Sequence, residues 1–411
     1  MTEPTIELIP SRPAVRSDGP TTLDVLVRIT PPTPEVHFVR PPINLGLVLD
    51  RSGSMQGAKK MEYAIDAACF AVEQLLPTDR VSVTIFDSEV ETIAPNAPAT
   101  DKAGLIGRLR QVTPRGATAL HAGWKEGADQ VESGRRAEGL DRVILLSDGL
   151  ANQGVTDPEA ISGEVRGLAS RGVSTTTMGL GDDYNEDLMQ AMGQAGDGNY
   201  YYIESPVQLV DIFQTELNGL MANLGRKVAL GLEPGHGARV AEVLNELGRD
   251  AGGGLILSNL VLGMPLTVVV RLAVDLFRDE AETCRFRLEW DAPEGGARRS
   301  ASASLALPAV PSAEWEAMAV DPGVAEQVAL LMAARAKKEA VAAYDRGDLD
   351  CTLAGVAFAA RVMREMPMSP TVARELGEID QLQADLAANQ GAKFRKRSAF
   401  QTFQRDRGQD K

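Results

Sequence analysis

The residues between Pro41 and Asn223 alternate short apolar runs with segments of helical periodicity, and this alternation restricts the fold more than any other feature of the chain. Residues 43–49 form a nearly continuous apolar run that ends in Asp50, as expected for a strand buried on both faces of a parallel sheet. Residues 58–76 then place their apolar side chains at helical spacing. Repeated strand–helix units of this kind predict a doubly wound α/β domain, which we assign to residues 41–224.

The same pattern predicts the remaining elements of this domain. Further strands are expected at residues 80–86, 142–146, 173–178 and 200–203. Further helices are expected at residues 101–111, 119–133, 158–170, 185–195 and 206–224. Pro158 stands at the first turn of its helix, where a missing backbone N–H has no cost.

Both flanks of this domain consist of short apolar runs separated by glycine and proline, a pattern typical of an antiparallel β-sandwich. Two strands are expected before the α/β domain, at residues 5–9 and 22–29, and several more between residues 225 and 311. Two strands alone cannot bury a sheet face. We therefore expect residues 1–40 to join residues 225–311 in one sandwich, into which the α/β domain is inserted.

The last hundred residues have a helical pattern. A helical bundle is expected over residues 312–390, with helices at 314–346, 349–365 and 372–388. Residues 391–411 contain seven Lys or Arg against two Asp and present no continuous apolar face. This composition predicts a flexible basic tail, which is either simply solvated or docks a partner or the acidic body of the same chain.

Composition restricts the class of function. The net charge of −15 repels phosphate backbones, which argues against nucleic-acid binding. The apolar runs are too short to cross a bilayer, and the first twenty residues contain no apolar signal segment. The three cysteines lie far apart without paired spacing, so no disulfide framework is indicated. We therefore expect a cytoplasmic protein without a membrane partner.

Hydroxyl and carboxylate side chains gather where the predicted strands end. Asp50, Ser52 and Ser54 follow the first strand, Thr118 precedes the helix at 119–133, and Asp148 follows the strand at 142–146. Open α/β sheets bind ligands at the carboxyl ends of their strands. Two carboxylates and three hydroxyls form an all-oxygen ligand set that suits Mg²⁺, with Mn²⁺ or Ca²⁺ as alternatives, and suits zinc poorly. The pattern predicts a single divalent metal site.

Simpler interpretations exist for individual residues. Ser54 could serve only to cap the helix that follows it. His121, one turn after Thr118, is a candidate contact for a ligand, although a histidine on a helix surface is the simpler interpretation. The chain contains no phosphate-binding G-x-x-x-x-G-K-[ST] loop, and no Ser-His-Asp set or C-x-x-C pair suggests itself. An enzyme is therefore not expected.

The D-x-S-x-S pattern at residues 50–54, together with Thr118 and Asp148, resembles the metal-ion-dependent adhesion site of von Willebrand factor A domains. The runs at residues 185–188 and 196–202 look like the late helix and final strand of that family. The resemblance covers roughly 180 of the 411 residues and extends to bacterial members of the calcium-activated-chloride-channel-homologue type. It implies that Ser52, Ser54 and Thr118 coordinate the metal directly, and that Asp50 and Asp148 do so directly or through water.

The resemblance also implies a function. Members of this family bind protein partners through an Asp or Glu that completes the metal shell, so a metal-dependent interaction module or scaffold is expected. A substrate-presenting or adaptor subunit of an AAA+ ATPase chaperone assembly is the alternative, because such proteins often work beside these ATPases. A cell-surface adhesin is disfavoured by the missing signal segment and disulfides, and a hydrolase by the missing general base.

Overall fold

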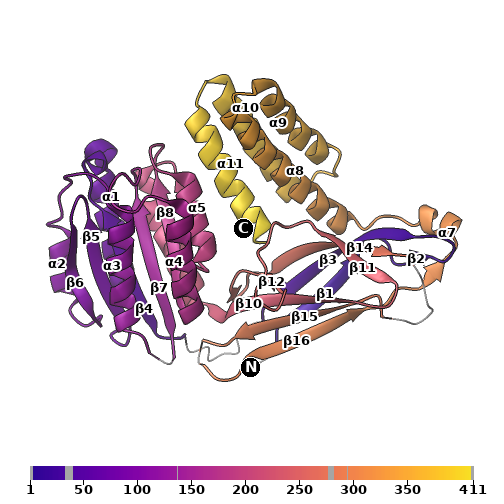
Figure 1. Cartoon of the computed structure of the whole chain (residues 1–411), viewed down its shortest axis with the longest axis horizontal. Coiled ribbons are helices and arrows are strands. Elements are labelled where there is room, and N and C mark those ends of the chain that lie inside the picture. Colours follow the sequence, from indigo (N-terminus) through magenta and orange to yellow (C-terminus); the bar gives the residue numbers. More distant parts are fainter. Residues whose placement is uncertain (1–2, 33–39, 137, 276–281, 294, 409–411) are drawn as a thin grey trace. The chain divides into compact units, whose positions relative to one another are not determined.

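The computed structural model describes residues 3–32, 40–136, 138–275, 282–293 and 295–408. The chain divides into two compact units (Figure 1). One unit comprises residues 39–223 with 293–295, and the other comprises residues 1–38, 224–292 and 296–411. The predicted insertion of an α/β domain into a second structural unit is confirmed.

The α/β unit contains a six-stranded sheet with the strand order β6-β5-β4-β7-β8-β9. Its strands are β4 (Ile43–Asp50), β5 (Arg80–Phe86), β6 (Val90–Pro98), β7 (Leu140–Ser147), β8 (Val173–Leu180) and β9 (Tyr200–Ile203). All neighbours pair in parallel except β5 and β6, which are antiparallel. Strand β6 was not predicted, because it is a partly exposed edge strand with two prolines, Pro95 and Pro98. Prolines are tolerated at such an edge and hide the strand pattern.

Six helices cover this sheet: α1 (Lys60–Gln74), α2 (Lys102–Leu109), α3 (Leu120–Ser133), α4 (Pro158–Arg171), α5 (Glu186–Ala195) and α6 (Leu209–Met221). Two short 3₁₀ segments, η1 (Gly53–Lys59) and η2 (Pro206–Gln208), precede α1 and α6. Helix α3 lies very close to the central strand, because a Cβ on Gly127 would stand only 2.1 Å from Cγ2 of Val48. The start of α3 is held beside the end of β5, because the backbone N–H of Ala119 donates to the Asp87 carbonyl at 2.8 Å.

The second unit contains two antiparallel sheets with the orders β1-β3-β14-β11 and β12-β10-β15-β16, and β13 pairs with β10. The strands are β1 (Thr5–Pro10), β3 (Thr21–Thr30), β10 (Asn223–Pro234), β11 (Ala238–Val243), β12 (Leu255–Ile256), β13 (Leu260–Val261), β14 (Leu266–Val274), β15 (Cys284–Asp291) and β16 (Arg299–Leu305). A short parallel pair joins β2 (Val15–Arg16) to β17 (Ala309–Val310). Since β3 pairs with β14 over its full length, the N-terminal strands complete the later sheet as predicted.

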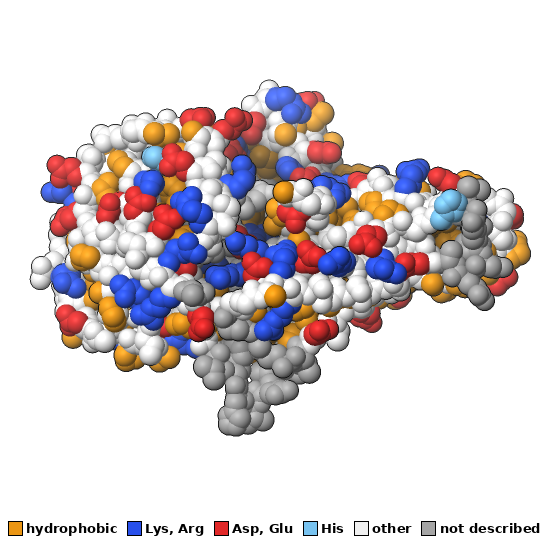
Figure 2. Space-filling model, turned by 60° about the horizontal axis from the view of Figure 1, so that its bottom comes forward, with side chains coloured by type: hydrophobic (Ala, Val, Ile, Leu, Met, Phe, Trp, Pro, Cys, Tyr) orange, Lys and Arg blue, Asp and Glu red, His pale blue; other side chains and the backbone are white. Residues whose placement is uncertain are grey.

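The two sheets share an apolar core that includes Val27, Val268 and Phe286. Strand β15 alternates buried and exposed residues, so its arginines face outward. Arg285 pairs with Glu282, and Arg298 pairs with Asp291. On the face displayed in Figure 2, basic side chains accordingly lie among acidic ones.

The helical region consists of α7 (Ser312–Ala317), α8 (Pro322–Asp345), α9 (Leu349–Arg364), α10 (Pro370–Ala387) and α11 (Gly391–Asp406). The single helix expected at residues 314–346 is split, because Asp321 caps a new helix that begins at Pro322. Helix α8 packs against α9 and α11, and also shares a small core with the sandwich through Leu331. None of the helices that the structure describes has the length and apolar character needed to cross a bilayer.

The flexible tail predicted for residues 391–411 is wrong over Gly391–Asp406, which form helix α11; residues 409–411 lie outside the described part of the chain. Phe394 and Phe403 are buried, and Arg397 pairs with Asp385 of α10 at 3.0 Å. Sequence periodicity missed this helix because its packed face is not purely apolar. Arg395, Arg397 and Arg405 instead pair with acidic residues of α8 and α10.

Candidate functional site

The carboxyl end of β4 positions the first three predicted ligands. Asp50 is the last residue of β4 and is fully buried. One of its carboxylate oxygens accepts the backbone N–H of Ser52 at 2.7 Å, and the other accepts the hydroxyl of Ser147 at the end of β7. Ser52 Oγ lies 3.0 Å from Ser54 Oγ in η1. The chain turns sharply after β4, so these side chains stay at the edge of the sheet.

The neighbouring strand β7 positions the fourth predicted ligand. Asp148 follows β7 directly, its side chain is fully buried, and its Oδ1 accepts the hydroxyl of Ser54 at 2.6 Å. Because β4 and β7 pair in parallel, their carboxyl ends meet at the same edge. The structure thus brings Asp50, Ser52, Ser54 and Asp148 together.

Thr118 reaches the same place from the loop before α3. Its backbone N–H donates to Asn152 Oδ1 at 3.0 Å, and the backbone N–H of Asn152 donates to the Thr118 carbonyl at 3.2 Å. A Cβ on Gly149 would stand 3.0 Å from Thr118 Oγ1 and 3.6 Å from Ser54 Oγ. Both hydroxyls therefore border the space that only a glycine leaves open. All five predicted ligands lie at one edge of the sheet.

Lys60, at the first position of α1, also belongs to this site and was not predicted. Its Nζ donates to Asp148 Oδ2 at 2.6 Å, and only 14% of its side chain is exposed. The two residues before it, Ala58 and Lys59, have left-handed backbones with φ of 51° and 58°. Nothing in the pattern of residues 58–76 indicates this turn, and the pattern alone predicts an ordinary helix there.

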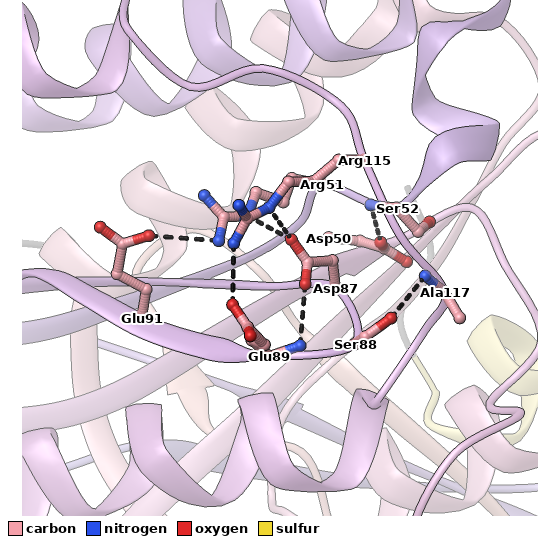
Figure 3. A network of polar contacts seen from close by, with 9 residues as sticks. All are labelled: Asp50, Arg51, Ser52, Asp87, Ser88, Glu89, Glu91, Arg115 and Ala117. Atoms are coloured by element: carbon pink, nitrogen blue, oxygen red, sulfur yellow. Dashed lines mark hydrogen bonds and ion pairs between the residues drawn. The ribbon is translucent and has the colours of Figure 1, made fainter.

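A second unpredicted feature is an ion-pair network beside the ligands (Figure 3). Asp87, which follows β5, accepts the Nε–H groups of Arg51 and Arg115, each at 2.8 Å. Arg51 also pairs with Glu91, and Arg115 with Glu89. Burial favours the neutral form of Asp87, but the hydrogen bonds it accepts outweigh this and hold its pKa below the ordinary value.

The network ties the loop that contains Thr118 to the ends of two strands. The Arg115 backbone N–H donates to the Arg51 carbonyl at 2.7 Å, and the Ala117 N–H donates to Ser88 Oγ at 3.0 Å. The available sequence signal was the position of Asp87, which follows its strand just as Asp148 follows β7.

The electrostatics of Asp50 differ from those of Asp87. Burial raises the pKa of Asp50 to about 6, and the hydrogen bonds from Ser147 and Ser52 offset this only in part. The donors to Asp50 are neutral hydroxyl and amide groups. Its ionised form is therefore poorly compensated by these neighbours.

The residues at this edge fit a hard divalent cation. Within the described residues, no group of three or more His, Cys, Asp and Glu side chains could hold a metal, so a metal at this edge would require hydroxyl ligands as well. Two carboxylates with three hydroxyls match the oxygen preference of Mg²⁺, and Gly149 keeps the space between two of the hydroxyls open. His121 is mostly buried and its Nε2 lies 3.2 Å from Glu164 Oε1, as expected of a helix residue packed on its neighbour.

Comparison with known proteins identifies the class of this domain. Residues 44–215 match the family model of the von Willebrand factor type A domain, and the chain therefore contains a domain of this family. An uncharacterized protein of Synechocystis sp., sll0103, is 31% identical over 189 residues, or 46% of this chain and 44% of that protein. The uncharacterized protein YfbK of Escherichia coli is 25% identical over 194 residues, or 47% of this chain and 34% of its own length. The matched segment thus covers less than half of either relative.

Solved structures extend the similarity to most of the chain. A von Willebrand factor type A protein from Catenulispora acidiphila has a TM-score of 0.72 at 16% identity and covers 92% of this chain and 90% of its own. The ArnB paralog VWA2 from Sulfolobus acidocaldarius has a TM-score of 0.62 at 17% identity and covers 98% of both chains. At these identities the similarity establishes the fold alone.

Proposed function

We propose that this chain is a metal-dependent protein-interaction module, whose metal-ion-dependent adhesion site holds one divalent ion and grips an Asp or Glu of a protein partner. The ligands in this proposal are Asp50, Ser52, Ser54, Thr118 and Asp148. Mg²⁺ is the expected ion, with Mn²⁺ or Ca²⁺ as alternatives. The convergence of these five oxygen-bearing side chains on one edge of a von Willebrand factor type A sheet carries the proposal.

The chain's own residues act by holding a rigid set of oxygens. Asp50 is fixed by the Ser52 amide and the Ser147 hydroxyl, and Asp148 is fixed by Ser54 and Lys60. Such fixed ligands bind an ion without a large loss of side-chain freedom. A bound divalent ion would supply a Lewis-acidic position for the partner's carboxylate. We propose that the chain acts by binding and not by catalysis.

The finer assignments belong to the same proposal. Membership of the bacterial calcium-activated-chloride-channel-homologue type is proposed from the resemblance of the sequence motifs alone. The alternative function, an adaptor subunit of an AAA+ ATPase assembly, differs in one respect that can be measured. It requires that a nucleotide-binding protein be captured together with this chain.

Metal binding by the purified full-length chain is the first test. Calorimetric titration with MgCl₂ and MnCl₂ should give one site, and Asp50→Ala should abolish it. Asp66→Ala, which removes an exposed carboxylate from α1, should bind as the unmodified protein does. Binding that is indifferent to Asp50→Ala would overturn the proposal.

Partner capture is the second test. The chain immobilised in MgCl₂ should retain a protein that EDTA releases and that Asp50→Ala does not capture. Substituting the acidic residues of the captured protein in turn should identify one whose loss ends retention. A partner held equally well in EDTA would exclude the metal from the interface.

A further inference from the structure

Lys60 is held inside the metal site although its sequence neighbour lies in solvent. Lys60 Nζ donates to Asp148 Oδ2 at 2.6 Å, and its side chain is 14% exposed. Lys59 is 71% exposed and pairs only loosely with Glu62, at 3.6 Å. The two lysines carry the same charge, so their different surroundings reflect the backbone that positions them.

That backbone is unusual. Ala58 and Lys59 are consecutive non-glycine residues in the left-handed region, with φ of 51° and 58°, where side chains of L-residues are disfavoured. Lys59 stands at the N-cap of α1 without a side-chain capping bond. The turn therefore lacks the capping bond that stabilises a helix start, and it places the Lys60 ammonium group against Asp148.

The ammonium group changes the charge of the site. Asp50 and Asp148 bring two negative charges, and Lys60 cancels one of them. The other nearby cations, Arg51 and Arg115, are more than compensated by the three carboxylates of Asp87, Glu89 and Glu91, so they add no positive charge to the ligand set. The ligand set with Lys60 thus carries one net negative charge, and a divalent ion bound there retains one positive charge.

We propose that Lys60 sets the ligand requirement of this site: it weakens the binding of the metal alone and makes tight binding depend on an external carboxylate. This inference rests on the proposed function and deepens it. Coupling between two ligands is reciprocal, so a carboxylate that tightens metal binding is itself bound more tightly by the metal-loaded chain. A site of this kind prefers an acidic partner segment to a neutral one.

The test compares Lys60→Met, Lys60→Arg and the matched control Lys59→Met in the full chain. The probe is Mn²⁺, titrated in chloride and again in excess acetate, with the free ion counted by electron paramagnetic resonance. In chloride, Lys60→Met should bind Mn²⁺ on the order of tenfold more tightly, the scale on which partners of metal ligands alter metal affinity. Acetate should tighten Mn²⁺ binding by the unmodified chain and have much less effect on Lys60→Met.

The controls separate charge from structure. Lys60→Arg keeps the positive charge and Lys59→Met removes one outside the site, so both should behave as the unmodified chain. Equal or weaker Mn²⁺ binding by Lys60→Met, or an undiminished effect of acetate, would overturn the inference. If Lys60→Met does not fold, Lys60→Gln serves in its place, with the same expected direction. Failure of the proposed function gives a different result: the unmodified chain binds Mn²⁺ no better than Asp50→Ala.

Discussion

Two buried carboxylates, Glu375 in the helical region and Asp50 in the α/β unit, meet the cost of burial in opposite ways. Glu375 on α10 accepts Lys337 Nζ of α8 at 2.7 Å and a guanidinium N–H of Arg405 on α11 at 2.9 Å. Burial opposes its ionisation, but the two cations outweigh this and lower its pKa. Asp50 is held by neutral donors, and burial raises its pKa to about 6.

Under the proposed function, the difference distinguishes a structural charge from a charge that binds a ligand. The cations around Glu375 come from two other helices, so the cluster joins α8, α10 and α11 and is complete within the chain. Asp50 is ionised at neutral pH without comparable compensation. Perturbed groups of this kind cluster at functional sites, where a ligand supplies what the protein does not. The comparison predicts that neutralising these two carboxylates has opposite effects on stability.

The largest effect is expected from Glu375→Gln. Removing one member of a buried ion pair leaves its partners uncompensated, and Lys337 is only 2% exposed, so the helical region should lose about 3–5 kcal/mol of stability. Hydrogen-exchange mass spectrometry resolves this region from the α/β unit and should show faster exchange in α8, α10 and α11. Glu339→Gln, at an exposed position of α8, is the control. Unchanged hydrogen-exchange protection in α11 would show that the ion pairs of Glu375 do not stabilise the helical region.

Asp50→Asn should have the opposite effect on stability and a large effect on metal binding. A pKa raised from 3.8 to about 6 means that the ionised form costs the folded unit about 3 kcal/mol at neutral pH, which a neutral side chain avoids. The metal-free variant should therefore be more stable, by about 2 kcal/mol if part of the cost is recovered. Its affinity for Mg²⁺ should fall about a hundredfold or more, because a direct ligand or its water anchor is lost.

Thermal unfolding with and without MgCl₂ measures both effects in one experiment. The stabilisation by Mg²⁺ should be lost in Asp50→Asn and retained in Asp66→Asn. If Asp50→Asn destabilises the metal-free chain as strongly as Glu375→Gln does, both carboxylates are compensated within the chain, and the contrast between them is wrong.

The sequence predicted those parts of the molecule that depend on local patterns. Strands β4 and β7 are buried throughout and mostly apolar, so the sequence indicated their positions and the polar residues that follow them. The convergence of Asp50 and Asp148 follows from the parallel pairing of the two strands. The sandwich was predicted from a physical requirement, since two N-terminal strands cannot bury a face without others.

The parts that were missed depend on contacts between distant residues. Helix α11 has few apolar residues, and three of its arginines pair with Asp345, Asp385 and Glu375, none of which stands out in the sequence. The position of Lys60 at the site depends on two preceding residues with left-handed backbones, a conformation that the backbone preferences of Ala and Lys do not favour. The pairing of Asp87 with Arg115 likewise requires that the end of β5 lie beside a loop 28 positions further along.

Gly149→Ala would change the space at the site and not its charge. In Gly149→Ala the new Cβ would stand 3.0 Å from Thr118 Oγ1, closer than most real contacts, so the hydroxyl must move. Metal affinity should fall about tenfold with little change in stability, since only one ligand is displaced. Gly163→Ala in α4, where a Cβ meets nothing within 4 Å, should bind metal normally. Equal affinities in the two variants would show that Thr118 does not contribute to the site.

The smallest effect is expected at Asp406, the last residue of α11. A substitution there tests whether the helical region also contains a buried carboxylate whose charge is not balanced by nearby cations. Burial raises the pKa of Asp406 to about 6, although its Oδ1 accepts the backbone N–H of Glu246 at 3.2 Å. The folded state therefore binds the proton more readily than the unfolded chain. The resulting stabilisation is complete below about pH 4 and is lost as the pH rises through 6.

Asp406→Asn is neutral at every pH and keeps an oxygen for the Glu246 amide. At pH 7 it should be more stable than the unmodified chain by about 1 kcal/mol, a discounted value because the side chain is only half-buried. At pH 4 the difference should vanish. Thermal unfolding at the two pH values measures this, with the exposed Asp380→Asn as control. A stability difference that persists at pH 4 would show that packing, and not the charge of Asp406, causes the effect. Of Asp50 and Asp406, only Asp50 would then remain as a buried carboxylate that lacks compensation within the chain.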